Sequence, residues 1–381
     1  MTKILTVANH IGSKGGLERS QLEICRQLHA RGHEVHLAYV HDGDFLPDWR
    51  AAGTTTIRIP TTLPSRRGLL RSLAGVARGL ASCWSVRPDV IYVHRYWDVP
   101  WALALGTLTS RPVVCHLHLA PGDSVPRWLM APMSRVSRFI AVSNDTAERW
   151  GRFGLDRRRI DVAHNGVAVD RFRPATADDR ELARKQLGID PDTFVVLYVG
   201  RVDPSKGIEV LLDAFVELDT ESVQLVIVGG PGVSDDPDVA RSLVDRAEGL
   251  GAKCIPPRRD VEHLYHCADV VVLPSLVAEA HSLVVMEALA SGIPVVASAV
   301  GGNTELLTGS LSEGLVEPGE PVLLAERLSS LRDWRTSRPD LEVQGRERVA
   351  SDLTWSRTAE KVERSLAAAM RRTRGSSRRS R

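Results

Sequence analysis

Short apolar runs alternate with helix-like segments in the first half of the chain. The first run, Ile4–Ala8, leads into a glycine-rich loop, Gly12–Gly16, and then into a segment whose apolar residues recur every three or four positions up to Gly32. Strands that alternate with helices favour a parallel sheet covered by helices on both faces. The later runs that we interpret as strands are Val35–Val40, Val90–Val93, Pro112–Leu117 and Phe139–Val142.

The same alternation restarts after residue 175. The new apolar runs contain almost no polar residue, which is typical of strands buried on both sides. A last helical pattern covers Trp355 to about Met370. The chain is therefore predicted to be an α/β protein with two doubly wound domains. The strands expected in its second half are Phe194–Val199, Leu225–Val228, Val270–Leu273 and Val295–Ala297.

A polar connection joins the two halves. It contains Asn165-Gly166 and the stretch Pro174–Asp179, which suits an exposed linker. The last eleven residues contain six Arg and no acidic residue and are rich in Ser and Gly, so we expect a disordered basic tail. The expected parts are an N-terminal domain over residues 1–172, a C-terminal domain over 173–352, a final helix over 353–370 and the tail over 371–381.

Composition and charge exclude several classes of protein. The 381 residues are 43% hydrophobic and 25% charged, as in globular proteins. Lys and Arg number 49 against 47 Asp and Glu, and six of the 49 lie in the tail, so the body is mildly acidic and no nucleic-acid partner is expected. No apolar run approaches the ~18 residues of a membrane-spanning helix, and no secretory signal is visible. We therefore expect a cytoplasmic protein with reduced thiols.

Two candidate phosphate-binding groups follow predicted strands, where parallel sheets bind their ligands. Gly15-Gly16 could bring backbone N–H groups to a phosphate at a helix start, or could be a plain strand-to-helix turn. Arg201 and Lys206 leave one strand end just before a helix. Two cations there would neutralise a diphosphate leaving group, unless they are solvated surface charges.

Two carboxylates and one histidine are the other candidates. Glu279 lies on the loop after Val270–Ser275, and Glu287 lies in an apolar helical segment, where an unliganded charge is costly. The two could hold two sugar rings, or could be a loop acid and a core-edge acid paired with Arg. His118 closes a strand; its neutral imidazole could bind a substrate hydroxyl, or it could be a satisfied histidine at a domain interface.

Metal binding is the weaker interpretation of the polar clusters. Asp42-Gly43-Asp44 and Asp236-Pro237-Asp238 match an Asp-x-Asp pattern, but the first is typical of a turn and the second of a loop. The groups Cys115–His118 and His263–Cys267 could ligate a metal in principle, yet adjacent residues on a strand point to opposite faces. We expect neither a metal nor a cofactor.

Together these motifs resemble retaining glycosyltransferases of family 4, from residue 3 to about residue 370. The resemblance implies the GT-B fold, in which two Rossmann-like domains face a cleft. The N-terminal domain would bind the acceptor, the C-terminal domain would bind the nucleotide-sugar, and the final helix would cross back to the first domain. The motifs that carry it are Gly15–Glu18, His118, Asn165–Val167, Asp170–Pro174, Gly200-Arg201, Lys206-Gly207, Glu279 with Glu287, and Ala290–Ala297.

The resemblance also implies roles for the matched residues. Gly15 and Gly16 would offer amides to the donor diphosphate. Arg201 and Lys206 would hold that diphosphate and stabilise it as it leaves. The leaving phosphate itself would assist deprotonation of the acceptor in a front-face substitution with retention, which needs neither a nucleophile nor a metal.

Further matched residues would contact the rest of the donor. Glu287 would bind the ribose hydroxyls, while Glu279 and His118 would touch the donor sugar, so that His118, Glu279, Arg201 and Lys206 make up the catalytic set. Backbone groups of His281, Ser282 and Leu283 would line the pocket for the sugar and phosphate.

Some positions depart from the family pattern. Many members carry Phe-Gly where this chain has His281-Ser282, which leaves the donor identity open. Arg258, in a loop that differs from the family, is a candidate contact of the base. Candidate acceptor contacts are His94, Arg95 and Tyr96, continuing to Trp97, and the segment Asp123–Trp128.

The predicted activity is transfer of a hexosyl-type sugar from a nucleotide-sugar to an acceptor hydroxyl. A UDP-sugar is favoured as donor, with a GDP-sugar as the alternative. The acceptor would be a natural product, a lipid-linked sugar or a cell-wall glycan. Two alternatives stay open: a phosphorylase or sugar-nucleotide epimerase with a similar cleft, and a module that contacts a membrane surface through the Arg tail.

Overall fold

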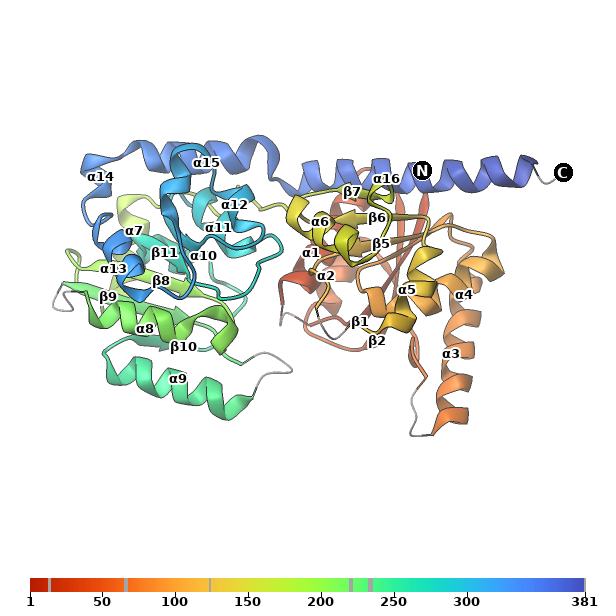
Figure 1. Ribbon diagram of the computed structural model, residues 1–381, viewed down its shortest axis with the longest axis horizontal. Helices are drawn as coiled ribbons and strands as arrows, with labels where there is room; N and C mark the ends of the chain where they lie inside the picture. Colours follow the sequence, from red (N-terminus) through yellow and green to blue (C-terminus); the bar gives the residue numbers. More distant parts are fainter. Residues whose placement is uncertain (13–14, 65–67, 123–124, 219–221, 232–235, 380–381) are drawn as a thin grey trace. The chain divides into compact units, whose positions relative to one another are not determined.

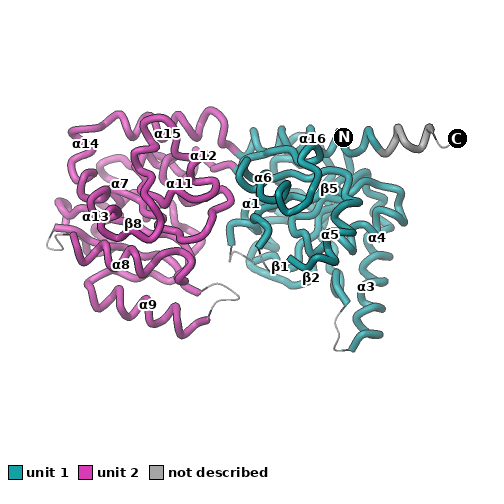
Figure 2. Tube along the Cα trace, in the orientation of Figure 1, with its two compact units in different colours: residues 1–165, 355–381 teal, residues 166–354 magenta. Residues whose placement is uncertain are grey.

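The computed structural model of the protein describes residues 1–12, 15–64, 68–122, 125–218, 222–231 and 236–379. The chain forms two compact units, shown in Figure 2. Unit 1 comprises residues 1–165 and 355–381, and unit 2 comprises residues 166–354. Within the described ranges, no helix has both the length and the apolar character that crossing a membrane requires.

Unit 1 is built on a seven-stranded sheet in which all neighbouring strands are parallel. The strand order β3-β2-β1-β4-β5-β6-β7 shows that the chain first moves outward on one side of β1 and then returns to its other side for β4. The strands are β1 Lys3–His10, β2 Glu34–His41, β3 Thr55–Arg58, β4 Val90–Val93, β5 Val113–Leu117, β6 Arg138–Ala141 and β7 Ile160–Val162.

The helices of unit 1 follow its strands in alternation, as the sequence pattern predicts (Figure 1). The α-helices are α1 Gly16–Ala30, α2 Leu46–Ala51, α3 Leu69–Trp84, α4 Val99–Thr109, α5 Arg127–Ser134, α6 Asn144–Phe153 and the C-terminal α16 Trp355–Arg379; the 3-10 helices are η1 Tyr96–Asp98 and η2 Arg157–Arg159.

Unit 2 repeats this architecture with a six-stranded parallel sheet of order β10-β9-β8-β11-β12-β13. Successive strands are added on one side of β8 as far as β10, and from β11 onward they are added on its other side. Apolar side chains such as Leu197 and Val271 are fully buried against helices on one face, and Val196 and Val272 on the other. The strands are β8 Phe194–Val199, β9 Val223–Val228, β10 Lys253–Ile255, β11 Val270–Leu273, β12 Val295–Ser298 and β13 Leu315–Val316.

The helices of unit 2 complete the α/β alternation, and the two parallel sheets confirm the predicted fold class. The α-helices are α7 Ala177–Gln186, α8 Ile208–Val216, α9 Pro237–Gly249, α10 Glu262–Cys267, α11 Leu283–Ala290, α12 Asn303–Leu306, α13 Pro321–Ser329, α14 Trp334–Ser337 and α15 Asp340–Asp352; the 3-10 helices are η3 Pro204–Lys206 and η4 Gly309–Gly314.

The C-terminal helix α16 belongs to unit 1, although it follows unit 2 in the sequence. It packs beside α1 and β6 and buries one apolar stripe. The Ser365 hydroxyl donates a hydrogen bond to Asp161 Oδ2 at 2.7 Å, and Glu363 forms a 2.8 Å ion pair with Arg31. The buried stripe consists of Ala359, Val362, Leu366 and Ala369.

Two predicted boundaries differ from the structure. The units divide between Asn165 and Gly166 rather than between residues 172 and 173, because Val167 and Phe172 pack into the core of unit 2. The segment expected to be a disordered tail continues α16 as far as Arg379. A helix that is already nucleated by packing extends at little cost when residues such as Arg follow.

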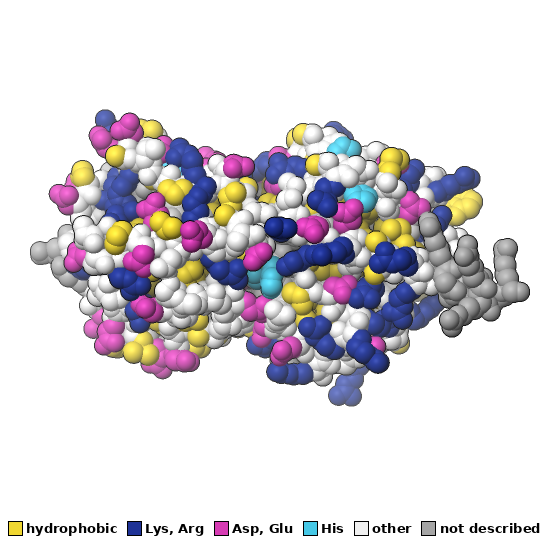
Figure 3. All heavy atoms as spheres, turned by 90° about the horizontal axis from the view of Figure 1, so that it is seen from above, with side chains coloured by type: hydrophobic (Ala, Val, Ile, Leu, Met, Phe, Trp, Pro, Cys, Tyr) yellow, Lys and Arg dark blue, Asp and Glu magenta, His cyan; other side chains and the backbone are white. Residues whose placement is uncertain are grey.

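Charged side chains of both signs are interspersed on the face of the molecule that Figure 3 shows. This distribution agrees with the small net charge of +2. On this face, charge therefore does not mark a single binding surface.

Candidate active site

A buried ion-pair network fixes the base of β11, the strand whose other end carries predicted site residues. Asp269 precedes β11 and is 5% exposed. It pairs with Arg184 at 2.6 Å and Arg180 at 2.5 Å and accepts a 2.8 Å hydrogen bond from the Val195 backbone N–H of β8. These contacts hold β8 and β11 in register, and so set where the loops at their far ends lie.

Those two loops lie at the point of unit 2 where the order of strands reverses, which is where open parallel sheets bind ligands. The loop after β8 carries Lys206, and the loop after β11 carries Glu279. Lys206 Nζ lies 2.6 Å from Glu279 Oε1, with 19% and 13% of the two side chains exposed. The structure thus joins a cation and a carboxylate that sequence reasoning selected separately.

Ser275 extends this pair. Its hydroxyl is fully buried and donates a 2.5 Å hydrogen bond to the same Glu279 Oε1. Glu279 is therefore held from two sides, and the contact with Ser275 does not depend on Lys206. Ser275 was not among the predicted site residues, because no motif distinguishes it from any other serine after a strand.

Gly207 lets the two loops approach each other closely. Its φ is +69°, and a Cβ atom at this position would lie 1.9 Å from the carbonyl oxygen of Pro274. Beside it, the Leu276 N–H donates to the Ser205 carbonyl at 2.9 Å. A side chain at position 207 would force these loops apart, and with them Lys206 and Glu279.

Arg201 lies on the same strand end as Lys206 but is held differently. Its guanidinium is 41% exposed and pairs with Asp203 at 3.2 Å, while the Tyr198 hydroxyl donates to its backbone carbonyl at 2.5 Å. The structure therefore places both predicted cations beside one strand end: Arg201 is more exposed and pairs with Asp203, and Lys206 is less exposed and pairs with Glu279.

The backbone of Glu279 rests on a second glycine pair that sequence reasoning missed. Gly302 N–H donates to the Glu279 carbonyl at 2.6 Å, and a Cβ on Gly301 would lie 2.3 Å from that same oxygen. Gly301-Gly302 follows β12 in the same way that Gly15-Gly16 follows β1, with two or more residues between strand and glycines. The place of Gly301-Gly302 shortly after a predicted strand is the sequence signal from which this glycine pair could have been predicted.

The start of α11 offers backbone amides beside the residues predicted to line the donor pocket. Ser282 is its N-cap and accepts a hydrogen bond from Val285 N–H at 3.3 Å, which leaves the first-turn amides of Leu283 and Val284 outside the helix ladder. Ser282 has φ −67°, so its replacement of the family glycine needs no unusual backbone. His281 beside it is 5% exposed.

Glu287 lies one turn further along α11 and is 4% exposed. The hydroxyl of Tyr265, on α10, donates a 2.8 Å hydrogen bond to its Oε2. A buried tyrosine is therefore one partner of this carboxylate. Tyr265 was not predicted, since it lies 22 residues away in a helix with no site motif.

Arg258 is the predicted site residue with the least support. It lies after β10 and forms an exposed 2.5 Å ion pair with Asp260. Nothing in its surroundings selects a base, and its predicted contact with the donor stays a prediction.

In unit 1, Gly15 and Gly16 begin α1 after β1. Gly15 is the N-cap without a capping side chain, and a Cβ there would lie 2.7 Å from Glu18 Oε2. Burial raises the pKa of Glu18, against a backbone hydrogen bond and the nearby Arg95, which lower it. Gly15 and Gly16 thus form a helix N-terminus without a capping side chain, and the phosphate contact of Gly16 stays a prediction.

Three histidines converge near the carboxyl ends of β4 and β5 in unit 1. His94, after β4, and His118, after β5, share a 2.9 Å hydrogen bond between Nδ1 and Nε2, and His116 Nδ1 bonds to the Tyr92 hydroxyl at 2.6 Å. Burial lowers the pKa of His118 to about 3 and those of His94 and His116 well below the usual value. All three imidazoles are therefore neutral at neutral pH.

These histidines line a cavity of about 160 Å³ together with other predicted residues. The acceptor candidates His94, Arg95 and Tyr96 and the donor candidate His118 all contribute to its wall, as does Leu17 of the glycine-loop helix. These residues lie in separate motifs of the sequence, and the sheet of unit 1 brings them to one cavity. Part of the other acceptor candidate, Asp123–Trp128, lies outside the described residues.

The predicted absence of a metal concerns the same histidines. Their ligand atoms lie within 4.8 Å of one another, the only such group of three found among the described residues. The Asp-x-Asp motifs have other roles: Asp236 caps α9 by accepting from Asp238 N–H, and Asp42 pairs with Arg58 at 3.1 Å. That these histidines hold no metal stays a prediction.

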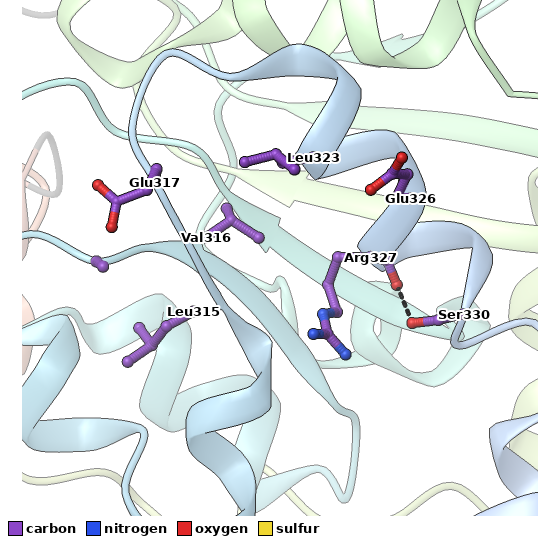
Figure 4. A pocket seen from close by; sticks show the side chains of 8 residues that line it. Leu315, Val316, Glu317, Leu323, Glu326, Arg327 and Ser330 are labelled. Atoms are coloured by element: carbon purple, nitrogen blue, oxygen red, sulfur yellow. Dashed lines mark hydrogen bonds between the residues drawn. The ribbon is translucent and has the colours of Figure 1, made fainter.

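A second hollow lies elsewhere in unit 2. It encloses about 500 Å³ between the end of β12, β13 and α13. Figure 4 shows Glu317, Glu326 and Arg327 around it, with the Ser330 hydroxyl donating to the Arg327 carbonyl. It contains none of the predicted site residues, and two of its three charged side chains are acidic, which does not suit a diphosphate.

Comparison with known proteins gives two family matches. Residues 179–348 match the family model for glycosyl transferases group 1, and residues 14–171 match that for glycosyltransferase family 4. Among named relatives, D-inositol 3-phosphate glycosyltransferase of Salinispora arenicola is 33% identical over 318 residues, 75% of this chain and 70% of the relative. The enzyme of that name from Corynebacterium diphtheriae is 30% identical over 388 residues, 92% and 89% of the two chains.

Solved structures share the fold. HepE of Anabaena in complex with UDP and glucose superposes with a TM-score of 0.85 at 22% identity and covers 96% of this chain and 100% of its own. Sucrose-phosphate synthase of Thermosynechococcus elongatus gives 0.79 at 23% identity, over 97% of this chain and 100% of its own. The predicted GT-B fold is thereby confirmed.

Proposed function

Because the chain belongs to glycosyltransferase family 4, we propose that it transfers a hexosyl sugar from a UDP-sugar to an acceptor hydroxyl with retention of configuration. The observation that carries the proposal is the ion pair of Lys206 with Glu279 at the strand reversal of unit 2. The pair supports the proposal because a cation suits phosphate and a carboxylate suits sugar hydroxyls.

In the proposed reaction, cations bind the diphosphate of the donor and a carboxylate binds its sugar. Lys206 and Arg201 bind the diphosphate and stabilise its charge as the glycosidic bond breaks. The first-turn amides of α11 add backbone donors at a helix N-terminus, where a phosphate is favoured. Glu279, released from Lys206 by the arriving phosphate, accepts hydrogen bonds from the sugar hydroxyls.

The remaining predicted residues complete the reaction. Glu287 binds the ribose, and Gly16 and His118 contact the diphosphate and the sugar. Because His118 is neutral, it hydrogen-bonds a sugar hydroxyl without adding charge. The leaving phosphate oxygen takes the proton of the acceptor hydroxyl, so no protein base is required.

A UDP-sugar is the preferred donor, with a GDP-sugar as the alternative. The structural relative HepE was solved with UDP and glucose, which supports UDP. The acceptor classes are a natural product, a lipid-linked sugar or a cell-wall glycan, and the names of the relatives add D-inositol 3-phosphate to the set that should be assayed.

Product analysis tests the proposal. The full chain is incubated with UDP- and GDP-sugars and with acceptors of each class, and the products are separated by mass and anomeric configuration. The proposal expects a glycoside whose anomeric configuration equals that of the donor sugar. Incubation with inorganic phosphate distinguishes the alternatives: a sugar phosphate would identify a phosphorylase, and an altered nucleotide-sugar without acceptor would identify an epimerase.

Replacing Glu287 by Gln is expected to raise the donor KM about tenfold or more and to change kcat little. The reason is that a ribose contact acts equally in the ground and transition states, and a hydrogen bond to a charged group contributes about 1.5–3 kcal/mol. Tyr265→Phe, which removes only the hydroxyl that positions Glu287, is expected to raise KM less. Steady-state kinetics measure both; an unchanged donor KM in Glu287→Gln would refute the ribose contact.

Transfer is expected to be independent of metal. Dialysis against EDTA or 1,10-phenanthroline should leave the rate unchanged, because Arg201 and Lys206 supply the positive charge that a metal would provide. The assay is repeated after adding Mg²⁺ or Zn²⁺ back. A rate that falls on dialysis and returns with either ion would contradict metal independence and would point to the three histidines.

A further inference from the structure

Helix α3 of unit 1 places its small residues inward. The buried positions are Gly75, Gly79 and Cys83. A Cβ on Gly75 would lie 3.3 Å from Pro60 Cβ, and one on Gly79 would lie 3.4 Å from Ile59 Cβ, so the helix backbone packs closely on the segment after β3. The line of α3 through Gly75 and Gly79 therefore has no room for large side chains, while Val76 and Leu80 beside it are partly buried against the core of unit 1.

Several other large apolar residues of α3 lie on its outer face. Leu70 is 84% exposed, Trp84 58% and Leu73 46%. With the exposed Ala77 and Ala81, they recur at spacings of three and four residues along the whole helix and form one continuous stripe. An ordinary surface helix turns such a stripe toward the core. A contiguous exposed apolar stripe of this kind indicates an interaction surface.

The surroundings of this stripe carry charge of one sign. From Trp49 to Pro88 the chain has seven Arg and neither Asp nor Glu. Arg71 and Arg78, seven residues apart and thus on the same side of α3, flank the stripe and are exposed. No acidic side chain within the described ranges forms an ion pair with either of them. Cations beside exposed Leu and Trp are the pattern of helices that lie on membranes.

We propose that the outer face of α3 docks unit 1 onto an anionic lipid bilayer. Leu70, Leu73 and Trp84 enter the boundary between headgroups and acyl chains, and Arg71 and Arg78 bind lipid phosphates. Figure 1 shows the N-terminal end of α3 extending beyond the neighbouring helices, which leaves its outer face accessible. A second copy of the chain fits this face less well, because a two-fold contact would set the same acid-free arginine surface against itself.

Vesicle sedimentation tests the docking. The full chain is mixed with vesicles of phosphatidylcholine alone and of phosphatidylcholine with an equal amount of phosphatidylglycerol. We expect pelleting with the anionic vesicles only, weakened by salt. The double variant Leu70→Ser/Leu73→Ser should bind at least about tenfold less, because two apolar side chains no longer leave water. Arg71→Gln/Arg78→Gln should also bind less and lose much of the salt dependence.

A matched control removes two equally exposed apolar side chains elsewhere. Val322 and Leu323 on α13 of unit 2 are 56% and 44% exposed, and Val322→Ser/Leu323→Ser should pellet like the unaltered chain. Thermal unfolding of each variant shows that the fold is retained. Because the assay measures lipid binding without donor or acceptor, its outcome is independent of the transferase activity.

Three results would overturn the proposal. One is equal pelleting of Leu70→Ser/Leu73→Ser and the unaltered chain, or no pelleting at all. Another is loss of binding in a full-length variant whose six arginines after residue 370 are replaced by Gln, with the α3 variant unaffected, which would assign the contact to the C-terminal end. The last is a dimer in sedimentation velocity that disappears in the α3 variant, which would make the stripe a self-association surface.

Discussion

Lys206→Ala is expected to lower kcat for sugar transfer by about a hundredfold to a thousandfold, the usual loss when one donor that stabilises an oxyanion is removed. Lys206 Nζ is 2.6 Å from Glu279 and only 19% of its side chain is exposed, so it acts where water screens little. As the diphosphate leaves, its negative charge grows, and the lysine interacts with it more strongly in the transition state than in the ground state.

The matched control is Lys185→Ala, which removes an exposed lysine of α7 in the same unit. It should leave kcat unchanged. Lys206→Arg keeps the charge and should recover part of the rate. Thermal unfolding of Lys206→Ala separates a loss of folding from a loss of chemistry. The double variant Lys206→Ala/Glu279→Gln, compared with both single variants, tests whether the ion pair acts as one unit. A Lys206→Ala rate within a factor of about two of the unaltered chain would remove Lys206 from the mechanism.

Acid is expected to destabilise unit 1 below about pH 6.5, the ordinary pKa of histidine. In the folded unit, burial lowers the pKa of His118 to about 3 and lowers those of His94 and His116 strongly. Between these values the unfolded chain binds protons that the folded unit does not. The contribution to stability is therefore complete above the unfolded pKa and is lost as the pH falls, by up to about 1.4 kcal/mol per pH unit for each histidine.

Chemical denaturation at several pH values measures this effect. Seven of the eight Trp lie in unit 1 and only Trp334 lies in unit 2, so tryptophan fluorescence reports mainly on unit 1. His116→Gln should lower the slope of unfolding free energy against pH between pH 6.5 and 4. The control His29→Gln alters an exposed histidine of α1. A slope equal in His116→Gln and the unaltered chain would contradict the effect of burial.

The sequence predicted the elements better than the partners of the site residues. Glu287 was identified because a charge is costly in an apolar helix, and Lys206 and Glu279 because they follow predicted strands. Ser275 and Tyr265 were not, since a serine after a strand and a tyrosine in a helix are unremarkable until the fold brings them to a carboxylate. Such partners depend on three-dimensional proximity, which periodicity does not encode.

Helix α3 shows a second limit of reasoning from sequence. Its apolar period is clear, and by itself would turn Leu70, Leu73 and Trp84 toward the core. The structure does the opposite, because the glycines of the other stripe allow closer packing on the segment after β3. The spacing of apolar residues indicates that a helix has two different faces. The volume of the side chains at the contact decides which face packs inside.

Calorimetric titration of the full chain with UDP, GDP and dTDP tests the central claim most directly, namely that the strand reversal of unit 2 binds a nucleoside diphosphate. The account predicts that UDP binds at one site, and that Lys206→Ala and Glu287→Gln each weaken binding at least about tenfold, or 1.4 kcal/mol, while Lys185→Ala does not. Absence of binding for all three nucleotides, or UDP binding that is unchanged in both site variants, would contradict it.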